Sequence, residues 1–145
     1  AAGVKRLGLE EHIAAWLPPD RLVPAVSQGA VAVQVREGDE ETRGWVGRLD
    51  HVPTRAATAS ERALLARLEG GCQVPVGALA LVEGKRLLLN AVVCSLDGTR
   101  AVEGSREGSA AGAENVGLAL AETLMEEGAE SILEEIRARP GEEGS

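Results

Sequence analysis

A pair of glycines, Gly70 and Gly71, divides the sequence into two parts with different periodicity. Before the pair, residues 56–69 are mostly Ala, Glu, Arg and Leu, which favour a helix. After it, residues 76–82 alternate as the residues of a strand do. Two glycines after a helix let the chain turn through left-handed conformations that residues with a Cβ resist. We therefore expect a helix that ends at this loop and is followed by a sheet.

Three strands are predicted after the loop, at residues 76–82, 86–94 and 100–106. The second carries the most apolar runs and is expected at the centre, whereas the third is polar and is expected at an edge. Asp97 and Gly98 are a hairpin signal between them. A further helix is predicted at residues 113–127, and Gly128 separates it from a helical pattern that continues to Ile136. A three-stranded antiparallel sheet with the helices on one face is the economical packing.

Residues 1–52 do not carry enough secondary structure to close a core alone. We expect a helical segment interrupted at Gly8, a strand at residues 31–35 and a helix at residues 40–49, with Asp39 as its N-cap. The fold class is thus predicted as α+β, a C-terminal domain preceded by a strand and helices of incomplete α/β lobes. The opening, without Met, reads as the end of a helix and indicates a piece of a longer chain.

The net charge of −8 argues against nucleic acid and against anionic membranes as partners. No apolar run approaches the roughly 18 to 20 residues of a membrane span, and residues 1–20 lack the apolar centre of a signal peptide. Two cysteines are too few for a disulfide scaffold. A reducing, cytoplasmic location is expected. Because the chain has no Phe or Tyr, its core must consist of Leu, Val, Ala and Ile.

Cys72 follows the glycine pair directly and is the residue with the clearest chemical potential. A role as a recycling nucleophile is poorly supported, because the thiol follows a helix C-terminus, whose dipole disfavours an anion, and neither histidine is nearby in the sequence. An attachment point fits better, since an anchor reacts only once. A small buried hydrophobe and a disulfide with Cys94 remain alternatives.

The other candidate residues favour structural roles. Cys94 ends an apolar strand, where packing is expected. His12 and His51 lack the spacing of metal ligands, so no metal is expected. By itself, Gln28 next to Gly29 indicates an ordinary turn. No catalytic residue is assigned, because the sequence shows neither a triad order nor a phosphate-binding loop.

Residues 68–77, with the sequence LEGGCQVPVG, closely resemble the cofactor-attachment motif of the hydroxymethylbilane synthase (porphobilinogen deaminase) family. Residues 17–20, 24–30 and 60–63 agree with that family in order and spacing, and Asp97, Gly98 and the helix at residues 117–128 are similar to its C-terminal domain. The resemblance implies a transferase of porphyrin and heme biosynthesis. It joins four porphobilinogen molecules into hydroxymethylbilane and releases ammonia at each step.

The resemblance also implies a dipyrromethane cofactor, attached by a thioether to Cys72, on which the tetrapyrrole chain grows. Gln28 is carried over as a loop contact near the pyrrole chain. Ser27 departs from the family, which usually has Gly there. If this position needs a positive φ, Ser costs on the order of 1 kcal/mol or more in strain.

In this mapping, residues 1–23 end the second domain, residues 24–52 form a strand and a helix that return to the first domain, and residues 53–145 are the C-terminal cofactor-anchoring domain. The family's catalytic aspartate and most arginines that hold pyrrole acetates and propionates have no match here, so the chain alone is expected to be inactive. The implied partners are porphobilinogen, the growing pyrrole chain and the missing N-terminal half, in an enzyme that is monomeric when complete. A non-catalytic α+β interaction module is the alternative, and a redox module based on Cys72 and Cys94 ranks third.

Overall fold

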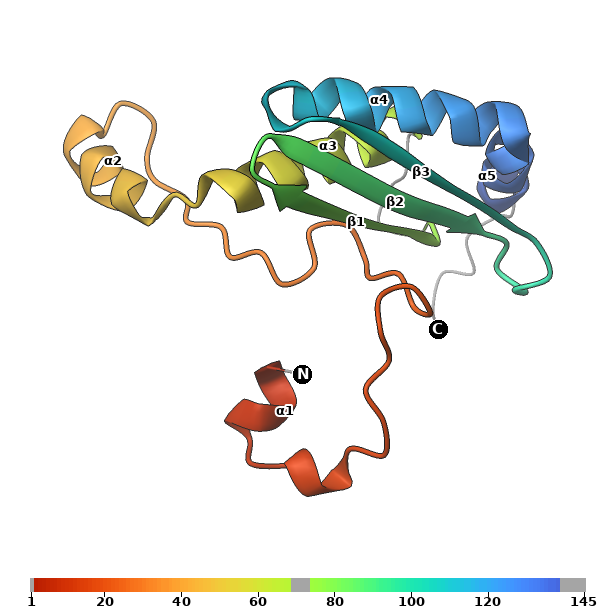
Figure 1. Cartoon of the computed structure of the whole chain (residues 1–145), viewed down its shortest axis with the longest axis horizontal. Coiled ribbons are helices and arrows are strands. Elements are labelled where there is room, and N and C mark those ends of the chain that lie inside the picture. Colours follow the sequence, from red (N-terminus) through yellow and green to blue (C-terminus); the bar gives the residue numbers. More distant parts are fainter. Residues whose placement is uncertain (1, 69–73, 139–145) are drawn as a thin grey trace.

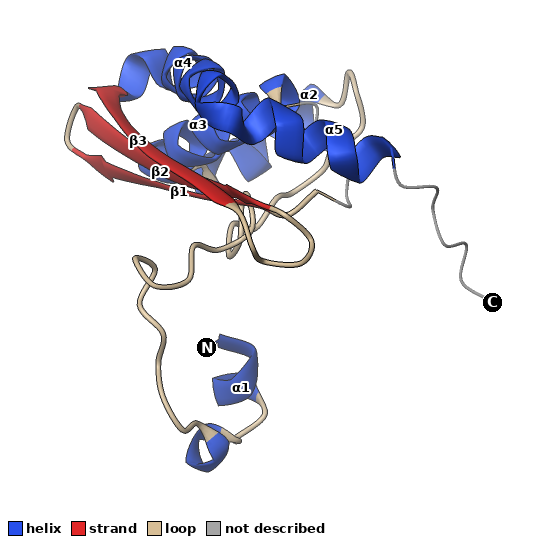
Figure 2. Ribbon diagram, turned by 90° about the vertical axis from the view of Figure 1, so that its right-hand side faces the viewer, coloured by secondary structure: helices blue, strands red, loops and turns tan. Residues whose placement is uncertain are grey.

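A three-stranded antiparallel sheet forms the centre of the computed structural model, which describes residues 2–68 and 74–138. Three helices, α3, α4 and α5, cover one face of this sheet, as Figures 1 and 2 show. The predicted α+β arrangement is confirmed, with β2 at the centre and β3 at an edge. The elements are β1 (Val76–Glu83), β2 (Arg86–Cys94), β3 (Ala101–Ser109), α3 (Val52–Arg67), α4 (Ala113–Leu124) and α5 (Glu130–Ala138).

Two short connections set the register of the sheet. Gly84 and Lys85 join β1 to β2, and Gly84 has a φ of 62°, which only glycine adopts readily. Between β2 and β3, the Asp97 carboxylate accepts hydrogen bonds from the Ser95 hydroxyl and the Thr99 N–H. The predicted hairpin is thus confirmed. β3 continues to Ser109, three residues beyond the predicted end at residue 106, because its residues pair with β2 as far as Arg86.

The core lies between the sheet and the helices and is entirely aliphatic, as the composition requires. A glycine brings α3 and α4 into close contact, since a Cβ on Gly117 would lie 2.1 Å from the backbone oxygen of Ser60. The largest fully buried apolar side chains are Leu64, Leu68, Leu87, Leu89, Leu120, Leu124 and Val93.

Gly128 ends the straight run of α4, as the sequence predicts. Its φ of 113° lies in the left-handed region, and a turn at Met125–Ala129 redirects the chain into α5. The new direction lets Arg137 of α5 reach α3, where its guanidinium donates a 3.1 Å hydrogen bond to the backbone oxygen of Leu68. Helix α5 therefore supports the end of α3.

The N-terminal part contains two short helices, α1 (Ala2–Arg6) and α2 (Glu40–Val46), each followed by a 3₁₀ turn. Gly8, with a φ of 66°, interrupts the first segment. Asp39 caps α2 as predicted, because its carboxylate accepts the Thr42 N–H at 3.0 Å, and this bond lowers the pKa of Asp39. Helix α3 begins at Val52, earlier than expected, since Pro53 suits the first turn of a helix.

The strand expected at residues 31–35 does not form, which corrects that part of the fold prediction. These residues have no regular secondary structure, and Val31 is 92% exposed. The alternation of Val31, Val33 and Val35 suits a strand, but no described strand lies beside this segment to pair with it. Backbone pairing in this region instead occurs at Ala25, which bridges to Gly77 of β1.

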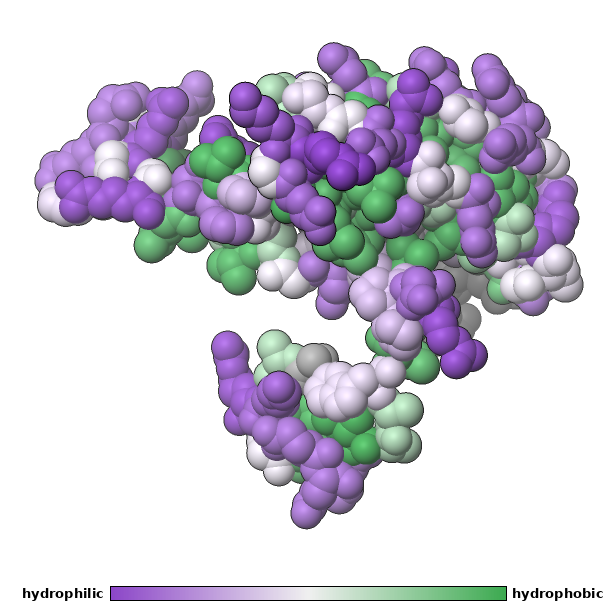
Figure 3. Space-filling view, viewed as in Figure 1, coloured by the Kyte–Doolittle hydropathy of each residue, from purple (hydrophilic) through white to green (hydrophobic). Residues whose placement is uncertain are grey.

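Helix α1 lies on the side of the sheet opposite to α3 and α4, as Figure 2 shows. Large hydrophobic side chains of this segment are exposed, including Leu7 and Trp16. In the lower part of Figure 3, green hydrophobic residues lie among purple hydrophilic ones. None of the helices in the described residues combines the length and the apolar character that a membrane crossing requires.

Candidate functional site

The turn that carries Gln28 is held by its own backbone. The Gln28 N–H donates to the oxygen of Ala25 at 3.0 Å, and the Ala30 N–H donates to the oxygen of Ser27 at 3.1 Å. Ser27 has a φ of 60°, so the condition stated for strain at this position is met. The side chain of Gln28 is exposed at the tip of the turn. It is therefore available to a ligand.

A buried carboxylate fixes this turn against the sheet. Glu61 of α3 is only 4% exposed, and its Oε2 accepts the Ser27 N–H at 2.7 Å. Its Oε1 accepts the Ala80 N–H at 2.8 Å, on the side of β1 that faces away from β2. Next to it, the oxygen of Pro24 accepts the Ala78 N–H at 2.9 Å. The segment at residues 24–27 and Glu61 thus provide acceptors for two backbone N–H groups on this edge of β1.

The neighbouring residue of α3 binds the same serine through its side chain. The Arg62 Nε–H donates to the Ser27 hydroxyl oxygen at 3.2 Å. Consecutive residues of one helix therefore contact Ser27, Glu61 at the backbone and Arg62 at the side chain. This double contact fixes where the turn lies along α3.

Arg62 also lines a groove of about 670 Å³ between α2, α3 and residues 30–35. Two other arginines on its walls have acidic partners. Arg43 lies 3.2 Å from Glu40, and Arg55 lies 3.3 Å from Asp50. No ion pair joins Arg62 to a carboxylate within residues 2–68 and 74–138. The Arg62 guanidinium can therefore donate hydrogen bonds to an anionic group of a ligand in this groove.

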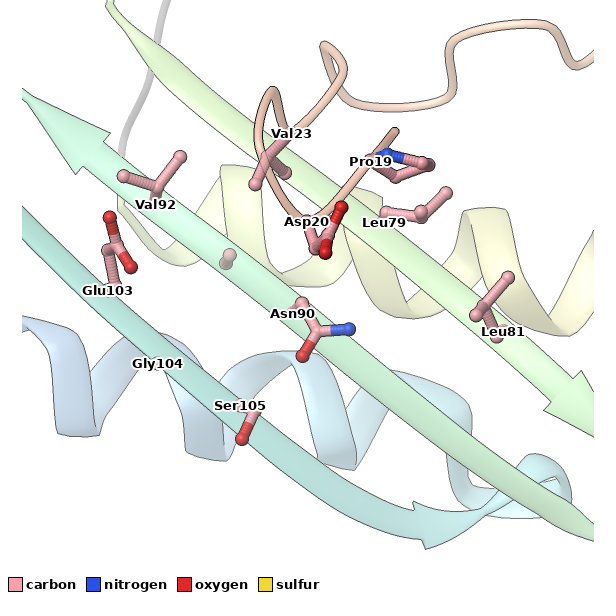
Figure 4. Close-up of a pocket in the computed structure, with 11 residues that line it drawn as sticks. Pro19, Asp20, Val23, Leu79, Leu81, Asn90, Val92, Glu103, Gly104 and Ser105 are labelled. Atoms are coloured by element: carbon pink, nitrogen blue, oxygen red, sulfur yellow. The ribbon is translucent and has the colours of Figure 1, made fainter. Parts of the chain in front are cut away.

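A second cavity, of about 620 Å³, lies on the open face of the sheet. In Figure 4, Asp20 and Val23 lie over the strands, with Asn90 and Glu103 below them. Asp20 and Glu103 give the lining a negative character, and the lining includes no basic side chain. A ligand with carboxylates would be repelled here, so the groove beside Arg62 suits such a ligand better.

Cys72, the predicted cofactor anchor, lies outside the described residues, but both neighbouring segments are described. On one side, Leu68 is buried at the end of α3. On the other, the oxygen of Pro75 accepts the Cys94 N–H at 3.0 Å, and β1 begins at Val76. The segment containing Cys72 therefore connects the end of α3 to the edge strand that holds the Gln28 turn. The role of Cys72 as the anchor and the role of Gln28 as a contact of the pyrrole chain stay predictions.

The last residue of the ten-residue motif has a visible structural role. Gly77 lies under the returning segment, and a Cβ there would be 3.0 Å from the backbone oxygen of Val23 and 3.2 Å from that of Pro24. The absence of a side chain at Gly77 lets residues 23–25 approach β1. Cys94 is half-buried at the end of β2, as its expected packing role implies.

Histidines and acidic residues do not form a metal centre in residues 2–68 and 74–138, because no group of three or more potential ligands gathers there. His12 lies 3.7 Å from Glu11, and the Nδ1 of His51 shares a 2.7 Å hydrogen bond with the Thr54 hydroxyl. Both histidines are exposed.

Sequence reasoning missed the role of Glu61. A signal was present, because Glu61 shares the helical spacing of Leu64 and Leu68, so an acidic residue stands on the buried face of α3. A charge at such a position requires polar partners. The contact of Arg137 with Leu68 had no signal of this kind, since it depends on the direction that α5 takes after Gly128.

Comparison with known proteins agrees with the motif. A family model described as "Porphobilinogen deaminase, C-terminal domain" matches residues 55–126, a range that includes Cys72, and one described as "Porphobilinogen deaminase, dipyromethane cofactor binding domain" matches residues 1–44, a range that includes Gln28. The porphobilinogen deaminase of Roseiflexus castenholzii is 53% identical over 92% of this chain, and that of Carboxydothermus hydrogenoformans is 48% identical over 94%.

A third relative, the porphobilinogen deaminase of Desulforudis audaxviator, is 49% identical over 94% of the chain. The chain spans 44% of the length of each of these three curated relatives. The two family models together cover both the N-terminal part and most of the sheet domain. With this identity along nearly its whole length, the chain belongs to the porphobilinogen deaminase family.

Proposed function

We propose that this chain forms part of a hydroxymethylbilane synthase, with Cys72 as the anchor of a dipyrromethane cofactor. The observation that carries the proposal is the motif at residues 68–77, which lies within the match to the family's C-terminal domain. The structure supports it through the two elements beside Cys72, since Leu68 at the end of α3 is buried and β1, which begins at Val76, is paired in the sheet. An anchor needs such a fixed base, because the attached pyrrole chain must reach its binding groups reproducibly.

The chemistry at Cys72 is a single substitution. Loss of ammonia from porphobilinogen leaves an electrophilic methylene on the pyrrole. The Cys72 sulfur attacks this carbon, a C–S bond forms, and the thiol proton is released to solvent. A thioether does not return to its reactants under mild conditions, so the position after a helix C-terminus, which disfavours a permanent thiolate, is acceptable for an anchor.

The residues around the Gln28 turn fit a group that carries carboxylates and pyrrole nitrogens. Gln28 offers an exposed amide that can both donate and accept hydrogen bonds, and Arg62 offers a guanidinium in the groove. When bound, the dipyrromethane supplies the end from which the pyrrole chain grows. In this proposal Gln28 contacts that chain, and residues 24–30 are held in place for it by Glu61.

The domain organisation is part of the same proposal. Residues 1–23 end the second domain, residues 24–52 belong to the first, and residues 53–145 form the C-terminal domain. The exposed segment at residues 31–34 and the exposed side chains near α1 support this division, because both would gain partners from further lobes of the enzyme. The catalytic acid and most carboxylate-binding arginines would come from those lobes, so the chain alone does not turn over. A cytoplasmic location and a monomeric complete enzyme complete the proposal.

Intact-mass measurement tests the anchor. The chain is mixed with porphobilinogen and the complementary part of a relative, and we expect a mass increase equal to one dipyrromethane. Cys72→Ser should abolish the increase, whereas the matched control Cys94→Ser should keep it. A Cys72→Ser protein that still gained the mass would refute the anchor.

A turnover assay tests whether the catalytic acid lies outside this chain. With porphobilinogen alone, the 145-residue chain should form no hydroxymethylbilane. Product from the chain alone would show that its own residues supply the catalytic acid, contrary to the proposal.

A non-catalytic interaction module is the second candidate, and one observation favours it. Large apolar side chains are exposed in the N-terminal part, with Leu49 at 74% and Trp45 at 60%. Such residues suit a surface that binds another protein. This candidate predicts a stable complex with the complementary part of a relative but no mass increase at Cys72, so the same sample distinguishes the two candidates.

A further inference from the structure

Ser27 adopts a backbone conformation that a serine does not favour. Its φ is 60°, in the left-handed region, where glycine carries no steric cost. The N–H of Ser27 is bound by Glu61 and its oxygen by the Ala30 N–H, so the turn cannot relax without loss of these bonds. Glycine would make the same backbone bonds. The hydroxyl is therefore the only polar group that serine adds at this position.

That hydroxyl accepts a hydrogen bond from the Nε–H of Arg62 at 3.2 Å. An arginine side chain has many rotamers, and an exposed one loses considerable entropy when it is held in place. A bond to Nε fixes the plane of the guanidinium and leaves the N–H groups of both terminal nitrogens free for another partner. Arg62 is also a wall of the groove beside α3, where the other two arginines already pair with Glu40 and Asp50.

We propose that Ser27 is a positioning residue that holds the Arg62 guanidinium in this groove for a ligand that carries a carboxylate. The ligand part rests on the proposed function, in which pyrroles with carboxylate side chains bind near the Gln28 turn. The orientation of Arg62 by Ser27 stands on the hydrogen bond alone. Where a glycine occupies this position, Arg62 has no such acceptor and must be oriented by the ligand itself.

Glu61 makes the arrangement precise. Both of its oxygens accept backbone N–H groups, from Ser27 and Ala80, so its carboxylate is engaged in holding the turn. The origin of the Ser27 hydroxyl is thus fixed relative to α3, the helix that carries Arg62. The Arg62 donor belongs to α3, and the Ser27 acceptor is held against α3 by Glu61. Both groups are therefore in place before a ligand binds, and binding does not have to order them.

Hydrogen exchange at the Arg62 Nε–H, measured by NMR on the labelled 145-residue chain, tests the orientation. Ser27→Ala removes the acceptor and keeps the Cβ, whereas Ser27→Gly removes both the acceptor and the strain. Both variants should exchange about fivefold faster at this site, as loss of one ordinary hydrogen bond implies. Ser27→Gly should nevertheless melt at a higher temperature than Ser27→Ala, so a change in stability alone cannot produce the same pattern. The Nε–H of Arg55 is the control and should not change.

Porphobilinogen titration, followed at the Arg62 side-chain resonance and by calorimetry, tests the ligand. Ser27→Ala should weaken binding about fivefold, and it should have no effect in a chain that already carries Arg62→Ala. Unchanged exchange in Ser27→Ala would overturn the positioning role. Faster exchange with equal porphobilinogen affinity would overturn the role in ligand binding. The dipyrromethane increment at Cys72 is measured separately, so failure here is distinguishable from failure of the proposed function.

Discussion

The backbone N–H of Ser27 donates a 2.7 Å hydrogen bond to the carboxylate of Glu61, which is buried between α3 and the edge of β1. This contact joins the N-terminal part of the chain to the sheet domain. The second carboxylate oxygen binds Ala80, so one side chain satisfies two donors from different segments. Removal of either oxygen leaves a buried N–H without a partner, which makes Glu61 a sensitive position.

Glu61→Gln tests this contact with little change in shape. The amide keeps one oxygen but presents an NH₂ group to the second N–H donor. We expect the free energy of unfolding to fall by about 1 to 3 kcal/mol, the cost of a buried donor without an acceptor. Urea unfolding measures the change. Glu134→Gln, at an exposed position of α5, is the control and should lie within about 0.5 kcal/mol of the parent. Equal stability of the two variants would contradict the role of Glu61.

Gly117→Ala tests the contact between α3 and α4. The new Cβ would lie 2.1 Å from the Ser60 oxygen and 2.9 Å from the Leu64 nitrogen, and both are backbone atoms that cannot rotate away. The helices must separate, so we expect a loss of about 1 to 3 kcal/mol or more in unfolding free energy, although alanine favours helices. Gly112→Ala, where a Cβ would meet no atom within 4 Å, is the matched control. A stabilised Gly117→Ala variant would disprove this packing.

Asp97 should titrate below its ordinary pKa of about 3.9. The hydrogen bond from the Ser95 hydroxyl and then those from Thr99 favour the ionised carboxylate and lower the pKa of Asp97. Because the folded pKa lies below the unfolded one, this stabilisation is present above about pH 4 and is lost as the pH falls through the folded pKa. NMR titration of the carboxyl carbon measures the midpoint. Ser95→Ala should move it upward, and an unshifted midpoint in the parent would rule out the bonded turn.

Amide exchange tests the corrected strand. Residues 31–35 have no regular secondary structure, so their N–H groups should exchange rapidly. The amides of β2, such as those of Leu89 and Val93, belong to a strand that has a paired neighbour on each side, and they should exchange slowly. Native-state hydrogen exchange followed by mass spectrometry or NMR separates the two segments. Slow exchange throughout residues 31–35 in the isolated chain would mean that the strand forms after all.

The sheet domain could be predicted because its signals are local. The alternation in β2, the turn residues Gly84 and Gly98 and the apolar spacing in α4 each lie within a few residues of the element they specify. The strand prediction for residues 31–35 was wrong because a strand also needs a partner that lies far away in the sequence. The alternation of these residues describes how a strand would face its neighbours, and pairing depends on a neighbour that local sequence does not supply.

The candidate site was predicted only in part. The ten-residue motif predicts Cys72 as the anchor, and the resemblance predicts Gln28 as a contact of the pyrrole chain, but neither pattern indicates which distant groups hold the Gln28 turn. Ser27 and Glu61 meet across 34 positions of sequence. Such contacts follow from how α3 packs on β1, which only the folded chain reveals. The positive φ at Ser27 was the exception, because the departure from Gly drew attention to it.

The packing of Gly117 against Ser60 also sets an order of events during synthesis. Helix α3 emerges from the ribosome before the sheet, but its buried face is completed by α4, which follows all three strands. Ser60 and Leu64 therefore lack their full surroundings until α4 has been translated. Because domains fold as units, the domain cannot close strand by strand. A nascent chain that stops before α4 should thus expose Leu64 and the rest of the buried side of α3 to chaperones.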